Sequence, residues 1–354
     1  DHNHGKVLTA AISVDTLAFV TKTDDNIVRI NSEGYVPFEQ NLDDLSFVES
    51  EAGNSKALVK GIAKYFVDNG FNVGGFTASV TSCVPAAAGV SSSASFELLI
   101  AEIFNVLYND GAVTKMKKAQ ASQYAENVYF LKPCGLMDQS AISLGGVSMI
   151  DFENVENPFV LGVQYPFTDT DIVITNTGGN HADLTSDYAA IRAEMEEVSE
   201  KFSEKYLRLV DYQKFLDAIP ALQSEVSGRA IMRAIHFFDE NLRVDKAVSA
   251  INMKNADAFY KIVGESGDSS FKLLQNCYVP ADTVQRIPLG IVLSQHVTGV
   301  KAVRVHGGGF AGTIIAFVEK AETHEYVSRM SEVFGAEHVY KLSIRQEGAC
   351  RVEF

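Results

Sequence analysis

The sequence predicts an α+β fold in two domains, residues 1–155 and 156–354. Three observations favour it. The chain has 354 residues, of which 46% are hydrophobic, which is enough for two cores of ordinary size. Strand-like segments alternate with helix-like ones, and a long helical pattern runs over residues 211–299. The composition turns polar over residues 153–158, where we therefore place the boundary.

Composition narrows the class of partner. A formal net charge of -15 and a pI near 5.0 argue against nucleic acid, because phosphate backbones are held mainly by Lys and Arg. No apolar run approaches the roughly 18 residues of a membrane span, and no charged leader precedes an apolar segment. The cysteines form no Cys-x-x-Cys pair, so neither a zinc site nor a disulfide framework is indicated. We expect a cytoplasmic protein.

The first domain is predicted to begin with strand-like residues 7–20. A helical pattern follows over residues 55–69 and ends at Gly70. A strand within residues 71–84 then leads into a loop, and helix resumes over residues 112–128.

Small residues and serines fill that loop, which we call the serine-rich loop (residues 85–95). An apolar helical pattern follows at once, so the loop opens directly into a helix. The first turn of a helix has backbone N–H groups without partners and the positive end of the helix dipole, so it can bind phosphate. A serine before a helix is also an ordinary N-cap, and a small-residue loop is often only a tight turn.

The pattern Pro-x-x-x-Gly-x-Ser-Ser-Ser-Ala in this loop resembles the phosphate loop of the galactokinase, homoserine kinase, mevalonate kinase and phosphomevalonate kinase (GHMP) superfamily. It is distinct from a Walker A loop, whose Gly-Lys-Ser/Thr ending is absent from the sequence. The resemblance implies that ATP is bound by Ala87, Ala88, Gly89, Val90, Ser91, Ser92 and Ser93.

A second motif, Pro-Cys-Gly-Leu-Met-Asp-Gln, ends in Asp138 and Gln139. An isolated Asp after a Gly is usually a turn or helix cap. The whole motif, however, resembles the galactokinase segment whose Asp faces the sugar hydroxyl that receives phosphate, and whose Gly, here Gly135, touches the sugar. Glu126 alone resembles a surface helix glutamate, but its spacing from Asp138 matches the family's magnesium ligand. The resemblance therefore implies a Mg²⁺ site at Ser93 and Glu126.

Two further sugar contacts rest on resemblance. The first twenty residues resemble the second half of the galactokinase signature, with Asp1 as its final aspartate, and the family's Arg, Glu and His would precede residue 1. Tyr188 stands where a family tyrosine bonds a sugar hydroxyl, although the family's double arginine is reduced to Arg192. Without the resemblance, a polar N-terminus is usually solvated, and a tyrosine at a helix start commonly packs half-buried.

A third motif contains Gly307, Gly309 and Gly312, which formally fit the G-x-G-x-x-G dinucleotide pattern. A strand-like run, residues 313–318, follows it where a dinucleotide site requires a helix. The run instead resembles the third GHMP motif, a glycine-rich loop between strands, and a nicotinamide dehydrogenase is not favoured.

Together the three motifs imply a GHMP kinase fold: a first domain like the second domain of ribosomal protein S5, a second domain of helices on an antiparallel sheet, and a site in the cleft between them. The implied reaction transfers the ATP γ-phosphate to the anomeric hydroxyl of α-D-galactose, with Mg²⁺, in a monomer. Two alternatives stay open. One is a kinase for a related sugar such as N-acetylgalactosamine, and the other is a non-catalytic regulator that binds galactose and ATP.

Overall fold

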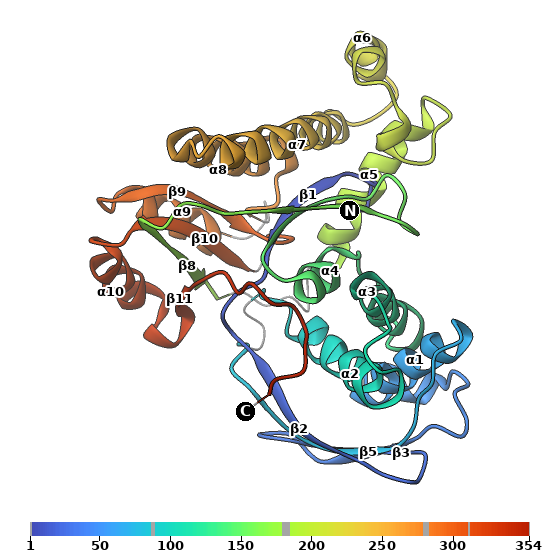
Figure 1. The fold of residues 1–354 in the computed structure, drawn as a ribbon. Coiled ribbons are helices and arrows are strands. Elements are labelled where there is room, and N and C mark those ends of the chain that lie inside the picture. Colours follow the sequence, from blue (N-terminus) through green and yellow to red (C-terminus); the bar gives the residue numbers. More distant parts are fainter. Residues whose placement is uncertain (1, 86–88, 179–184, 279–282, 311, 354) are drawn as a thin grey trace. The chain divides into compact units, whose positions relative to one another are not determined.

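The structure is a computed structural model that describes residues 2–85, 89–178, 185–278, 283–310 and 312–353 (Figure 1). The chain forms two compact units. The N-terminal unit contains Thr9–Val147 and Ile344–Phe354, and the C-terminal unit contains Asp1–Leu8 and Ser148–Ser343. Each end of the chain belongs to the unit that is formed mainly by the opposite half of the sequence. Near the C-terminus, for example, the Arg345 backbone N–H donates to the Ala11 carbonyl at 2.9 Å, and the Arg345 carbonyl accepts from the Gly146 N–H at 2.8 Å.

The N-terminal unit is built on a four-stranded sheet in the order β2 (Thr16–Lys22), β5 (Phe76–Ser82), β3 (Ile27–Ser32) and β4 (Phe38–Asn41). The β5 strand runs antiparallel to β2 and parallel to β3. Along β5, alternate side chains are buried, which is the period expected of a sheet with one covered face. The strand-like residues 7–20 form two strands in different sheets, β1 (Lys6–Ala10) and β2.

Helices cover one face of this sheet (Figure 1). The predicted helix over residues 55–69 is confirmed as α1 (Ser55–Asp68), whose N-cap Asn54 accepts a hydrogen bond from the Lys56 backbone. The predicted helix over residues 112–128 is shorter in its α-helical part, and its end is a π-helix. The remaining helical elements of this unit are η1 (Glu49–Glu51), α2 (Ser92–Tyr108), α3 (Lys115–Tyr124), the π-helix η2 (Ala125–Tyr129) and α4 (Met137–Leu144).

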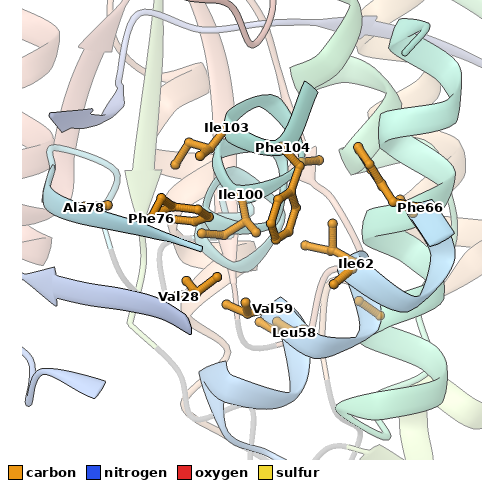
Figure 2. Close-up of a cluster of buried hydrophobic side chains, with 14 of the residues drawn as sticks. Val28, Leu58, Val59, Ile62, Phe66, Phe76, Ala78, Ile100, Ile103 and Phe104 are labelled. Atoms are coloured by element: carbon orange, nitrogen blue, oxygen red, sulfur yellow. The ribbon is translucent and has the colours of Figure 1, made fainter. Parts of the chain in front are cut away.

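The core of the N-terminal unit lies between the sheet and helices α1 and α2 (Figure 2). Phe66, Phe76 and Phe104 are fully buried there, one from each of α1, β5 and α2. The Phe104 ring centroid lies 5.9 Å from that of Phe66 and 5.6 Å from that of Phe76. Truncating such a ring to Ala typically costs about 3–5 kcal/mol. This packing fixes the strand before the serine-rich loop relative to the helix after it.

The C-terminal unit contains an antiparallel sheet in the order β11 (Val339–Leu342), β8 (Thr170–Asn176), β10 (Thr313–Glu319) and β9 (Val300–His306). The strand order β1, β6 (Val147–Asp151), β7 (Phe159–Val163) makes a third sheet. In the described part of residues 211–299 the chain is largely helical, as predicted. The helical elements in this range are α6 (Tyr212–Leu222), α7 (Gly228–Asn252), α8 (Ala256–Ser269), η4 (Ser270–Leu274) and α9 (Arg286–Gln295). The other helical elements described in this unit are α5 (Thr185–Glu200), η3 (Leu207–Leu209), α10 (Thr323–Phe334) and η5 (Ala336–His338).

Within the described ranges, no helix combines the length and the apolar character needed to cross a membrane.

Candidate active site

The serine-rich loop ends in an unusual backbone conformation. Ser91 is the N-cap residue of α2 and has φ 61° and ψ 49°, in the left-handed region that non-glycine residues seldom adopt. Its side chain makes no capping hydrogen bond. The Ser91 hydroxyl instead donates to Asp138 Oδ2 at 2.5 Å. Ser91 thus occupies the N-cap position but does not use its side chain as a cap. A non-glycine residue in this strained conformation is typical of functional sites.

Asp138 lies in the first turn of α4, one residue after the helix begins at Met137. The residue is exposed, whereas the next side chain, Gln139, is buried. A carboxylate near a helix N-terminus is stabilised in its charged form by the helix dipole. The local fold thus presents an accessible carboxylate beside a serine hydroxyl of the serine-rich loop.

Glu126 is the second carboxylate at this loop, and it is only 2% exposed. It lies in the π-helix η2, a rare element that often occurs at functional sites. Ser93 Oγ donates to Glu126 Oε1 at 3.1 Å. Lys132 Nζ binds the same oxygen at 2.8 Å, and Gln139 Nε2 donates to Oε2 at 3.0 Å.

Ser93 and Glu126 together offer hydroxyl and carboxylate oxygens, the donors that Mg²⁺ prefers. No cluster of three or more His, Cys, Asp or Glu side chains suited to a metal is present in the part of the chain that the structure describes. A protein site with one carboxylate and one hydroxyl still fits Mg²⁺, because this ion commonly takes its remaining ligands from phosphates and water.

A third acidic residue, Glu97, is connected to Glu126 through Gln139 and is fully buried. Its Oε2 accepts a hydrogen bond of 3.2 Å from Gln139 Nε2, which also serves Glu126. Burial, and secondly the charge of Glu126, raises the pKa of Glu97 to about 9. Burial therefore favours the neutral, protonated form of the Glu97 carboxyl. Among the described residues, Glu97 Oε1 and Gln139 Oε1 have no hydrogen-bond partner.

The loop that carries Lys132 to Glu126 is held in place by amide hydrogen bonds. The Lys132 backbone N–H donates to the Glu126 carbonyl at 3.0 Å. Asn127 accepts from the Cys134 backbone at 2.6 Å and donates to its carbonyl at 3.2 Å. Burial raises the pKa of the Cys134 thiol, so this cysteine stays neutral and is no candidate nucleophile.

The C-terminal unit contributes a second set of predicted residues. Tyr188 of α5 donates its hydroxyl to the Gly309 carbonyl at 2.7 Å, and its ring packs edge-on against Phe310 with centroids 5.1 Å apart. Gly309 has φ +81°, and an added Cβ there would overlap the Asn276 carbonyl oxygen. The glycine-rich loop connects antiparallel strands β9 and β10, which is not the strand–helix context of a dinucleotide site.

The predicted residues thus fall into groups. Ser91, Ser93, Glu126 and Asp138 come together within the N-terminal unit, where Gly89, Val90, Ser92 and Gly135 also belong. Tyr188 belongs to the C-terminal unit. The predicted sites at Asp1, Ala87 and Ala88 lie outside the described residues.

Three neighbours of the site were not among the predicted site residues. Lys132 directly precedes the Asp138 motif, Gln139 is the last residue of that motif, and Glu97 lies in α2. The one signal that could have found Glu97 is an acidic residue on the buried stripe of an otherwise apolar helix. Nothing in the local pattern indicates that Lys132 and Gln139 reach Glu126.

The serine-rich loop, the start of α2 and the two carboxylates that contact loop serines indicate a kinase of the GHMP class. Residues 57–146 match the family model for the GHMP kinases N terminal domain. Galactokinases are similar to this chain over almost its whole length, among them three from different organisms. That of Clostridium tetani is 30% identical, with 96% of this chain and 86% of the relative covered, and the human enzyme is 29% identical, with 99% and 87% covered.

The third is the crystal structure of Lactococcus lactis galactokinase complexed with galactose, which is 26% identical and superposes with a TM-score of 0.82 over 98% of this chain and 90% of that chain. The chain belongs to the galactokinase family of the GHMP kinases. The predicted α+β, two-domain GHMP kinase fold is confirmed by this likeness.

Proposed function

We propose that this chain transfers the γ-phosphate of ATP to the anomeric hydroxyl of α-D-galactose, giving galactose 1-phosphate and ADP. One observation carries the proposal most directly. Two carboxylates, Asp138 and Glu126, contact two serines of one phosphate-type loop, at 2.5 and 3.1 Å. The membership in the galactokinase family and the galactose bound in the Lactococcus lactis enzyme support the choice of sugar.

Asp138 is the residue to which we assign the acceptor sugar. Phosphoryl transfer to an alcohol requires the acceptor oxygen to be held in line and its proton to be accepted. The Asp138 carboxylate is accessible and is oriented by the Ser91 hydroxyl. It orients the anomeric hydroxyl and takes its proton as the new phosphorus–oxygen bond forms. The Gly135 backbone, Tyr188 and Asp1 are proposed to contact the other sugar hydroxyls.

We assign the nucleotide phosphates to the serine-rich loop, through Ala87, Ala88, Gly89, Val90, Ser91, Ser92 and Ser93. Backbone N–H groups at the start of α2 donate to phosphate oxygens, and the dipole of a 17-residue helix favours their negative charge. Ser93 and Glu126 would hold Mg²⁺. When bound, this ion neutralises charge that develops on the transferring phosphate.

We further propose that the protein acts in the cytoplasm as a monomer. Cys83, Cys134, Cys277 and Cys350 are all free, which fits a compartment that keeps thiols reduced. The cytoplasm also supplies the ATP that the proposed reaction consumes. Size-exclusion chromatography with light scattering tests the oligomeric state.

A hexose panel tests the proposed function. ADP release is measured by a coupled assay with ATP, Mg²⁺ and, in turn, galactose, glucose, mannose, N-acetylgalactosamine or no sugar, with Asp138→Asn as the control. We expect ADP release with galactose at least about ten times faster than with the other sugars. Release only with N-acetylgalactosamine would assign the other substrate. Galactose and ATP binding without ADP release would instead identify a regulator.

A further inference from the structure

Lys132 forms an ion pair with the carboxylate to which we assign the metal. Its Nζ lies 2.8 Å from Glu126 Oε1, and the side chains of the pair are 60% and 3% exposed. Ser93 Oγ lies 3.1 Å from that same oxygen, whereas Gln139 occupies Oε2. Glu126 Oε1 accepts the hydrogen bond from Ser93, the other proposed Mg²⁺ ligand. The Lys132 ammonium pairs with this same oxygen.

The position of Lys132 is set by the fold of its loop. Leu131 has φ 61°, which turns the chain back toward the π-helix, and the Lys132 N–H then bonds the Glu126 carbonyl at 3.0 Å. The paired hydrogen bonds between Asn127 and Cys134 close the same loop. These bonds fix the Lys132 backbone next to Glu126, so that the ammonium lies within reach of the carboxylate.

Two cations at one carboxylate oxygen repel each other, and the repulsion is strong where the oxygen is shielded from water. Glu126 is such a site. The pair also satisfies a buried negative charge that would otherwise be costly. Any divalent ion that binds Glu126 Oε1 must therefore displace the ammonium or tolerate it nearby, and both lower the affinity for the ion.

We propose that Lys132 competes with Mg²⁺ for Oε1 of Glu126 and sets a weak affinity for the free metal ion. This inference rests on the proposed function, which assigns Mg²⁺ to Ser93 and Glu126. Without metal, the Lys132 ammonium balances the negative charge of the buried Glu126 carboxylate. Mg²⁺ binds there once nucleotide phosphates supply further oxygen ligands to the ion. Lys132 thus lowers the affinity for the metal ion and is not itself a ligand of the metal or of phosphate.

Titration calorimetry of Mg²⁺ alone into the full chain, without nucleotide and without sugar, tests the competition for the free ion. Lys132→Met is expected to bind Mg²⁺ about three- to tenfold more tightly than the wild type, as for loss of one partly exposed ion pair. Lys132→Arg keeps the charge and should stay within about twofold of the wild type.

The matched control is Lys64→Met, which removes an exposed ion pair, Lys64 Nζ to Asp68 Oδ1 at 2.6 Å, and changes net charge equally. It should leave the Mg²⁺ affinity unchanged. Because the Lys132 side chain is 60% exposed, Lys132→Met should keep the wild-type circular dichroism spectrum, and Lys132→Gln provides a polar second variant.

Unchanged or weaker Mg²⁺ binding in Lys132→Met and Lys132→Gln overturns the proposal, as does equal tightening in Lys132→Arg or Lys64→Met. Binding is read without sugar, so this result is separate from galactose phosphorylation. If galactose is not phosphorylated, the proposed function fails, and the calorimetry still decides whether Lys132 competes for the metal.

Discussion

Glu97→Gln is expected to stabilise the protein, by an amount that grows with pH. Glu97 is fully buried, and its pKa is raised from 4.5 to about 9, first by burial and then by the charge of Glu126. In the unfolded chain the carboxyl has its ordinary pKa. The stability that its neutral form contributes is complete below pH 4.5 and is lost as the pH rises through about 9, because only the unfolded chain releases the proton.

The size of the effect follows from proton linkage. One proton retained by the folded state lowers the free energy of unfolding by about 1.4 kcal/mol for each pH unit in this window. Between pH 5.5 and 8 the wild type should thus lose roughly 3 kcal/mol that Glu97→Gln keeps. The new amide also brings N–H donors next to Gln139, whose Oε1 has no partner among the described residues.

Urea unfolding followed by far-ultraviolet circular dichroism at several pH values measures this effect. The method suits a chain without tryptophan. Exposed Glu49→Gln is the control and should follow the wild-type pH dependence. If the stability of Glu97→Gln falls with pH in parallel with the wild type, Glu97 does not carry a proton in the folded state, and the reasoning on its burial is refuted.

Three other substitutions test separate parts of the account. Ser93→Ala should raise the Mg²⁺ concentration for half-maximal activity several-fold, because one oxygen ligand is lost, and an unaltered Mg²⁺ titration would count against this ligand. Tyr188→Phe removes a hydroxyl that contacts Gly309 and, we propose, the sugar; it should raise KM for galactose about tenfold with KM for ATP unchanged, and equal changes in both would argue for a structural role. Gly309→Ala should lower thermal stability by roughly 2 kcal/mol or more, because its φ is +81° and a Cβ would overlap Asn276; an unchanged melting temperature would contradict the overlap.

Much of the N-terminal unit could be predicted because its signals are local. The apolar period and Gly70 predict α1, and the small residues before an apolar run mark the start of α2. The pairing of Ser91 with Asp138 could be expected only from the resemblance of two motifs, because the residues are 47 positions apart. Local chemistry alone predicts a capping hydrogen bond from the Ser91 side chain to the backbone of α2, and the structure has none.

The rest of the site depends on contacts that no local pattern encodes. The π-helix at Glu126 continues α3 without a break in sequence character, so the sequence predicted one uninterrupted helix. The bond from Gln139 to Glu97 spans 42 positions and connects α4 to α2. The placement of each chain end in the unit formed mainly by the opposite half of the sequence likewise has no local sequence signal. It depends on backbone pairing such as that of Arg345 with Ala11.

The role of Asp138 is the central claim, and one comparison tests it most directly. Turnover of galactose and the Kd of an ATP analogue are measured for the wild type and Asp138→Asn, which keeps the shape of the side chain and removes its basicity. We predict that kcat falls by roughly a hundredfold or more while the Kd changes by less than about threefold. A kcat within about threefold of the wild type would contradict the assignment of the acceptor hydroxyl to Asp138.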